Sequence, residues 1–167
     1  MDGRGVSEGD APWDGPGPGG ADGPGPGGAD AASGTGVEGP FEWVHRGLEL
    51  LDRGDAWAAA VLLERAARNE PASSSVREAL SRAYFDSGRF EQAAASFHEL
   101  VALTPTSDYA HFGLGLALTR LDRFELAIEH LAMAVAMRPD RREYVDRLRQ
   151  ARATLSARRR AHQELSS

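Results

Sequence analysis

The 167-residue sequence predicts an all-α protein built from repeated helix pairs. Beyond residue 40 it contains three prolines, Pro71, Pro105 and Pro139, and both intervals between them are 34 residues. Between these prolines the apolar residues recur at the three- and four-residue spacing of amphipathic helices, and no segment has the pattern of a strand. A fixed period of this length is typical of solenoids, in which each repeat packs on its neighbours.

Residues 1–40 differ in composition from the rest of the chain. They hold 14 of the 19 glycines and 6 of the 9 prolines, and the octapeptide DGPGPGGA occurs twice in succession, at residues 14–21 and 22–29. Because few apolar side chains are available there to offset the entropy of ordering the backbone, we expect a disordered tail. The tail is acidic, with one arginine against seven acidic residues, whereas residues 41–167 balance 18 arginines with 18 acidic residues.

The 34-residue step places three repeats within residues 41–140, at about 40–73, 74–107 and 108–141. The same step aligns Gly54, Gly88 and Asp122 at the point where a first helix must end in a left-handed residue. Glycine adopts that conformation without a Cβ clash, and aspartate tolerates it. Each proline follows a second helix, which it cannot continue.

The apolar spacing predicts where the paired helices lie, near residues 41–53, 56–69, 74–87, 90–103, 107–121 and 124–137. Two pairs of residues have the spacing of a capping box at a helix start, Ser75 with Glu78 and Asp140 with Glu143.

A seventh helix is predicted over residues 141–160, followed by a disordered C-terminus at residues 161–167. Tyr144, Leu148, Ala151 and Leu155 form one apolar stripe on an otherwise arginine-rich helix. A helix of this kind can cover the apolar end of a repeat stack and present a polar back to solvent, so we interpret it as a cap.

These residues resemble the tetratricopeptide repeat family, whose pattern is W-x2-L-G-x2-Y, then A-x3-F, then P. Arg46 stands where a leucine is usual, and Arg77 and His111 replace the first aromatic residue. The resemblance covers about residues 40–140 and implies a right-handed α-solenoid of three helix pairs with a capping helix. The matching residues are Trp43, Gly47, Ala59, Ala66 and Pro71, then Leu80, Tyr84, Ala93, Phe97 and Pro105, then Leu114, Gly115, Ala127, Ala134 and Pro139.

After the packing positions are assigned, a second stripe of residues remains along each first helix. In the tetratricopeptide repeat family this stripe lines a concave groove that holds peptides. The resemblance therefore implies a non-catalytic adaptor or scaffold that binds a peptide or an amphipathic helix of another protein. The candidate groove residues are Val44, Leu48, Leu51, Glu78, Arg82, Phe85, Tyr109, Phe112, Leu116 and Arg120.

Two alternatives remain open for the apolar stripe, and two other uses of the chain are less favoured. The apolar stripe can mediate homodimerisation or permanent docking in a larger complex, and part of it can pack against the cap or the tail. Nucleic-acid binding through Arg158–Arg160 is less favoured, because no exposed stacking aromatic lies nearby. A clamp for chaperone C-termini is not favoured, since the lysines and asparagines it requires are missing from the first two repeats: Val44, His45, Leu48, Glu78, Ala79 and Arg82 occupy those places.

Several classes of function are excluded by what the sequence lacks. It has no cysteine, and its five histidines show no metal-binding spacing. No phosphate-binding loop or nucleophile motif is present, so we expect no enzyme activity, no metal and no cofactor. No apolar stretch approaches 18 residues and the first ten residues do not resemble a signal peptide, so we expect a cytoplasmic protein that does not span a membrane.

Overall fold

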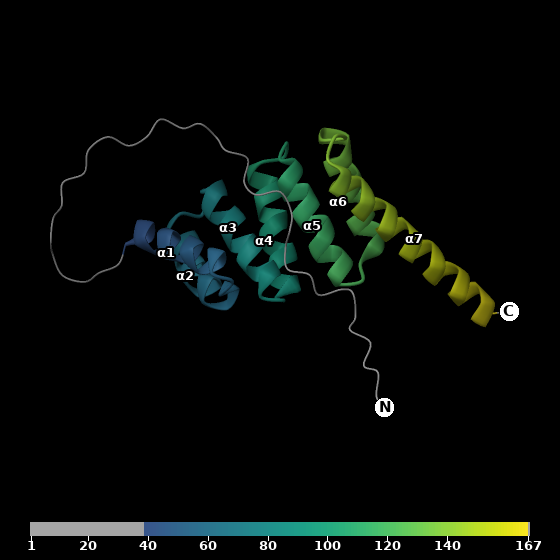
Figure 1. The fold of residues 1–167 in the computed structure, drawn as a ribbon, viewed down its shortest axis with the longest axis horizontal. Coiled ribbons are helices and arrows are strands. Elements are labelled where there is room, and N and C mark those ends of the chain that lie inside the picture. The colour runs from purple at the N-terminus through teal and green to yellow at the C-terminus, as the bar shows by residue number, and fades with distance from the viewer. Residues whose placement is uncertain (1–38, 167) are drawn as a thin grey trace, which may run out of the picture.

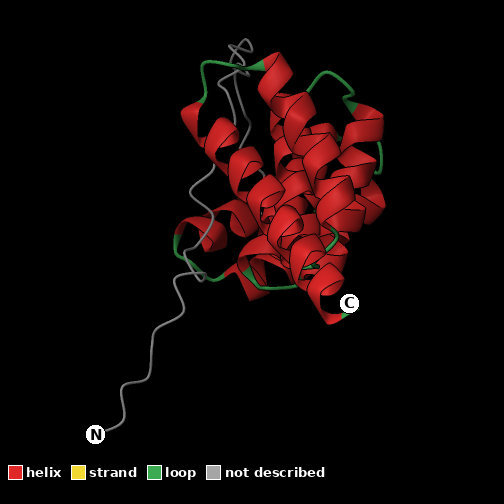
Figure 2. Cartoon of the chain, turned by 90° about the vertical axis from the view of Figure 1, so that its right-hand side faces the viewer, coloured by secondary structure: helices red, strands yellow, loops and turns green. Residues whose placement is uncertain are grey.

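The computed structural model describes residues 39–166, which form α-helices and no strand (Figure 2). The all-α fold and its helix pairs are therefore confirmed. Of the expected disordered tail, residues 1–38 lie outside the described part of the chain. The helices are α1 (Pro40–Asp52), α2 (Ala56–Asn69), α3 (Ser74–Asp86), α4 (Phe90–Leu103), α5 (Asp108–Arg120), α6 (Phe124–Met137) and α7 (Arg142–Leu165).

The helices stack in chain order from α1 to α7, and each packs on the next (Figure 1). The first helices also pack on one another, because α1 contacts α3, α3 contacts α5 and α5 contacts α7. Among the described residues α2, α4 and α6 make no such contacts with each other. The stack therefore curves, with α1, α3, α5 and α7 on its inner face and α2, α4 and α6 on its outer face.

The turn inside each pair has the conformation that the sequence predicts. Gly54 and Gly88 have φ of 81° and 74°, and Asp122 has φ of 61°. In each case the preceding first helix ends and the chain reverses into the second helix. The left-handed residue thus recurs with the 34-residue period of the sequence.

The helix starts correct the predicted capping boxes. The hydroxyl of Ser73, not Ser75, caps α3 by accepting a hydrogen bond from the amide of Val76 at 3.4 Å. Asp140 does not cap α7, whose N-cap residue is Arg141, because the Asp140 carboxylate accepts a hydrogen bond from Arg138 at 2.8 Å. The first difference is a register shift between two serines that could each serve as a cap, whereas the side chain of Arg141 makes no capping hydrogen bond.

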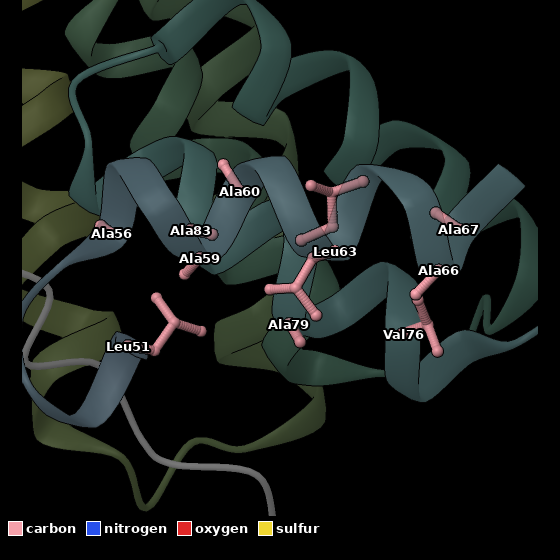
Figure 3. Close-up of a cluster of buried hydrophobic side chains, with 11 residues drawn as sticks. Leu51, Ala56, Ala59, Ala60, Leu63, Ala66, Ala67, Val76, Ala79 and Ala83 are labelled. Carbon is pink, nitrogen blue, oxygen red and sulfur yellow. The ribbon is translucent and has the colours of Figure 1, made fainter. Parts of the chain in front are cut away.

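A small residue allows the two helices of each pair to approach closely. A Cβ on Gly47 would lie 2.7 Å from Cγ of Leu63, and one on Gly115 would lie 2.6 Å from Cγ of Leu131. The middle pair has Ser81, whose buried hydroxyl donates to Oγ of Ser96 at 2.8 Å. Figure 3 shows Leu63 within the apolar cluster that joins α1, α2 and α3.

The last helix closes the apolar end of the stack, as predicted. Tyr144 is fully buried, Leu148 and Ala151 are nearly so, and Leu155 packs against the same cluster. Arg158 binds Asp122 at 2.8 Å and Arg159 binds Glu125 at 3.2 Å, which ties the outer part of α7 to the turn before α6 and to its first residues.

The expected disordered C-terminus at residues 161–167 is wrong for residues 161–165, because α7 continues to Leu165. No glycine or proline follows Arg160 to stop the helix. The hydroxyl of Ser166 donates to the carbonyl of His162 at 2.9 Å at the helix end.

We expect Leu80→Ala, in the middle pair, to lower the free energy of unfolding by about 2 to 5 kcal/mol. Leu80 is 3% exposed, so its loss leaves a cavity that the stack cannot fill by a local shift. Leu103→Ala, at a side chain that is 40% exposed on α4, is the matched control and should change stability by roughly 0.5 kcal/mol or less. Equal midpoints of denaturant unfolding for the two variants would contradict this packing.

Candidate peptide-binding groove

The inner face begins with an apolar surface on α1. Phe41 is 77% exposed and Leu48 is 44% exposed, and the half-buried Val44 lies between them on the same side of the helix. No helix precedes α1 in the described residues, and Phe41 and Leu48 stay exposed there, whereas Val44 packs partly against the first apolar cluster. This end of the inner face offers large apolar side chains to a ligand.

The middle of the inner face is polar and comes from α3. Nε of Arg82 lies 3.4 Å from Oδ2 of Asp86, one turn further along the helix. Burial raises the pKa of the Glu78 carboxyl. The pKa of Tyr109 on α5 is also raised, mainly by burial and then by the charge of Glu78. These groups form a partly desolvated polar band that can orient a ligand.

The α5 side of the inner face combines an apolar residue with a cation. Leu116 is half-buried, and the Arg120 guanidinium lies 4.7 Å from the centroid of the Phe90 ring. Phe85 meets the same ring edge-on, with 5.4 Å between the centroids. Phe90, the first residue of α4, thus contacts both Phe85 and Arg120 and holds them in place.

Three of the ten candidate residues have little or no exposed surface. Leu51 is 5% exposed and packs with the first apolar cluster, and Tyr109 is 8% exposed and packs near Phe97. Phe112 is fully buried, because Tyr144 of α7 stacks on it with 4.2 Å between the ring centroids. The cap therefore takes up part of the stripe. The candidates that keep exposed surface are Val44, Leu48, Glu78, Arg82, Phe85, Leu116 and Arg120.

Apolar residues on the outer face are not among the candidates that the sequence pattern indicated. On α6, Leu126, Met133 and Met137 are exposed, and their spacing places them on one side of the helix. That spacing is the signal that could have identified them. A cavity of about 420 Å³ lies between α4 and α6, and its lining residues include Leu126 together with Leu114 and Leu118 of α5.

A histidine pair lies beside this outer cavity. Nδ1 of His111 is 3.1 Å from Nδ1 of His130, and Nε2 of His111 is 3.1 Å from the carbonyl oxygen of Pro105. Since a carbonyl only accepts, Nε2 of His111 carries the proton, and Nδ1 of a neutral His111 accepts from His130. Burial lowers the pKa of His130, and the nearby His111 and His98 lower it further.

Two other classes of site find no support in residues 39–166. No group of three or more histidine, aspartate or glutamate side chains there could hold a metal ion. No described helix combines the length and apolar character that a bilayer crossing needs.

Comparison with known proteins identifies the repeat. A family model described as "Tetratricopeptide repeat" matches residues 45–108 and again residues 78–142, and together these matches cover more than half of the chain. A search of the curated proteins finds no match.

Several solved structures share the fold at low sequence identity. The first TPR domain of Spaghetti (RPAP3) bound to the HSP90 peptide SRMEEVD is 20% identical, with a TM-score of 0.66 over 70% of this chain and 93% of that one. The second TPR domain of human RPAP3 with the HSP70 peptide SGPTIEEVD is 19% identical, with a TM-score of 0.63 over 68% and 98%. MamA from MSR-1 is 22% identical, with a TM-score of 0.67 over 74% and 71%.

We expect acid to destabilise the fold through His130. Its folded pKa lies below the unfolded value of about 6.5, so unfolding takes up a proton between the two pKa values. The free energy of unfolding should therefore fall as the pH decreases from about 7 through this window, and show no such contribution above it.

His130→Gln tests this expectation, because its amide can still donate to Nδ1 of His111. The variant should lose less melting temperature than the native chain between neutral and mildly acidic pH. His45→Gln, at an exposed side chain, controls for the substitution itself. Parallel curves of melting temperature against pH for the native chain and His130→Gln would disprove the role of His130.

Proposed function

The chain belongs to the tetratricopeptide repeat family, a protein-interaction scaffold rather than a catalytic family, and we propose that its inner face binds a peptide or an amphipathic helix of a partner protein. The observation that carries the proposal is the exposed apolar surface of Phe41, Val44 and Leu48 on α1. A contiguous apolar patch on the concave side of a small protein favours binding of another polypeptide. The two RPAP3 domains with the same fold bind peptides.

The chemistry of the groove favours an apolar or amphipathic ligand. The two RPAP3 ligands end in the acidic sequence EEVD. In this chain Glu78 and the Arg82–Asp86 ion pair occupy the middle of the groove, so the band holds two carboxylates against one guanidinium. A strongly acidic tail would meet repulsion there. We infer a ligand with apolar residues for α1 and a polar contact for Arg82 or Arg120.

The exposed part of the groove is small, so we infer an affinity on the order of micromolar, as is common for short segments bound to a preformed surface. We also propose that the protein is cytoplasmic, as expected from a sequence without a long apolar stretch or a signal-peptide pattern.

We expect Leu48→Glu combined with Leu116→Glu to weaken ligand binding at least about tenfold, because each change buries a carboxylate against an apolar ligand without a partner. Ligands would be selected from a displayed peptide library with the native full chain, and their dissociation constants measured by fluorescence anisotropy. Circular dichroism would establish that the variant keeps its helices.

Leu126→Glu is the matched control, since Leu126 is 48% exposed on the outer face. It should leave those dissociation constants unchanged. A folded groove variant that binds the selected peptides as tightly as the native chain would refute the groove, as would equal weakening by the control.

Homodimerisation through the same surface is a second candidate, because α1 ends the described stack with Phe41 77% exposed. Light scattering of the native chain would then give a dimer that Leu48→Glu converts to a monomer. A monomer at micromolar concentrations would rule out this use of the surface.

A further inference from the structure

A basic cavity of about 390 Å³ lies on the outer face, between α2 and the start of α4, and residues of α3 also line it. Arg68 comes from α2, Arg77 from α3 and Arg89 from the residue before α4, so three separate segments supply its guanidinium groups. Glu64 and Tyr84 complete its polar lining. Because the inner groove is formed by α1, α3 and α5, this cavity is a separate surface.

Positive charge exceeds negative charge around this cavity. Oε1 of Glu64 accepts from the hydroxyl of Tyr84 at 3.0 Å and from Nη2 of Arg89 at 3.0 Å. Arg77 pairs with Glu99 of α4 at 3.0 Å. Arg68 is exposed and has no acidic partner among residues 39–166. Three guanidinium groups therefore face two carboxylates.

Hydrogen-bond donors are also left over at the cavity. Nε of Arg77 and Nη1 of Arg89 are buried and have no acceptor in the described part of the chain. Buried donors of this kind are normally paired, and a charged donor without an acceptor is costly. Both donor atoms are shielded from solvent, so an entering carboxylate would meet the exposed Arg68 first and would need a local side-chain shift to reach them.

The repeat itself does not require this basic cavity. Thirty-four residues further along, His98, Leu118 and Arg123 take the places of Glu64, Tyr84 and Arg89 in the cavity between α4 and α6. There Arg123 pairs with Glu91 at 3.2 Å. Of these two cavities only the first is lined by three arginines, and its Arg68 has no acidic partner among residues 39–166, so its charge is a property of this surface and not of the fold.

We propose that this cavity binds a carboxylate of the chain's own N-terminal segment, residues 1–38. That segment carries seven acidic residues and one arginine, so its charge is complementary to the cavity. Asp14, Asp22, Asp30 and Glu38 follow one another at eight-residue intervals. Several equivalent carboxylates are thus available to the cavity.

The segment joins the fold at the end of the stack that carries the cavity. The short turn between Asp52 and Ala56 makes α1 and α2 antiparallel, and Gly47 faces Leu63, so the start of α1 at Pro40 lies beside the end of α2. That end of α2 carries Ala67 and Arg68, which line the cavity. Covalent linkage to this point gives the carboxylates an effective concentration in the millimolar range, which lets an otherwise weak contact form.

The test uses a spin label on the full-length chain. Because the sequence contains no cysteine, Ala29→Cys gives a single attachment site between Asp22 and Asp30. Paramagnetic broadening of backbone amide signals then shows where the label spends time. We expect selective loss of signal around Arg68, Arg77 and Arg89, and recovery when salt is raised to about 1 M, where the Debye length falls to about 3 Å.

Matched variants separate charge from packing. Arg68→Glu, at an exposed side chain, should abolish the selective broadening, whereas Arg68→Lys should keep it. Asp22→Asn combined with Asp30→Asn should weaken the broadening, because it removes negative charge from the N-terminal segment. Arg142→Glu makes the same charge change at a 94% exposed side chain on α7 and should have no effect.

Each contrary result overturns the proposal. Broadening centred on the arginines of α7 would mean that the cap holds the segment, and broadening along α1 and α3 would place it in the inner groove. Uniform or absent broadening, or broadening near Arg68 that survives Arg68→Glu, would show that the cavity does not bind it. None of these outcomes depends on ligand binding by the inner groove, which the Leu48 and Leu116 variant tests separately.

Discussion

The close approach of the two helices within each pair is the contact on which the rest of the structure depends. In the outer pairs a glycine on the first helix receives a leucine of the second, Gly47 with Leu63 and Gly115 with Leu131. In the middle pair a hydrogen bond between Ser81 and Ser96 occupies the equivalent place. A larger side chain at these positions would separate the helices and displace the next pair with them, because each pair is packed only on its neighbours.

Curvature follows from that packing and produces two different surfaces. The first helices touch one another along the inner face, so their side chains are crowded and one end is closed by Tyr144 of α7. The second helices remain apart, and a cavity lies in each interval between them. The two cavities have the same origin, but the first contains Glu64, Tyr84 and Arg89 and the second contains His98, Leu118 and Arg123. One repeat geometry thus supports different chemistry at successive positions.

The inner stripe illustrates how far a periodic pattern can predict a binding surface. The spacing predicted which residues share the inner side of each first helix, and of these Leu48 and Arg120 are exposed. It did not distinguish them from Phe112, which has the same repeat position as Val44 but is buried by Tyr144. The difference arises 32 residues further along the chain, in a helix whose position depends on packing. Exposure is therefore a property of the assembled stack and not of a position within the repeat.

The sequence by itself determined the features that depend on local chemistry: the 34-residue period, the helix pairs, and the left-handed residues at Gly54, Gly88 and Asp122. Only the tertiary structure decided among local alternatives of similar energy, such as Ser73 over Ser75 as the cap of α3. It alone brought Arg68, Arg77 and Arg89 to one cavity. Backbone conformation is selected by neighbouring residues, whereas burial and charge clustering depend on segments that are distant in sequence and meet only after folding.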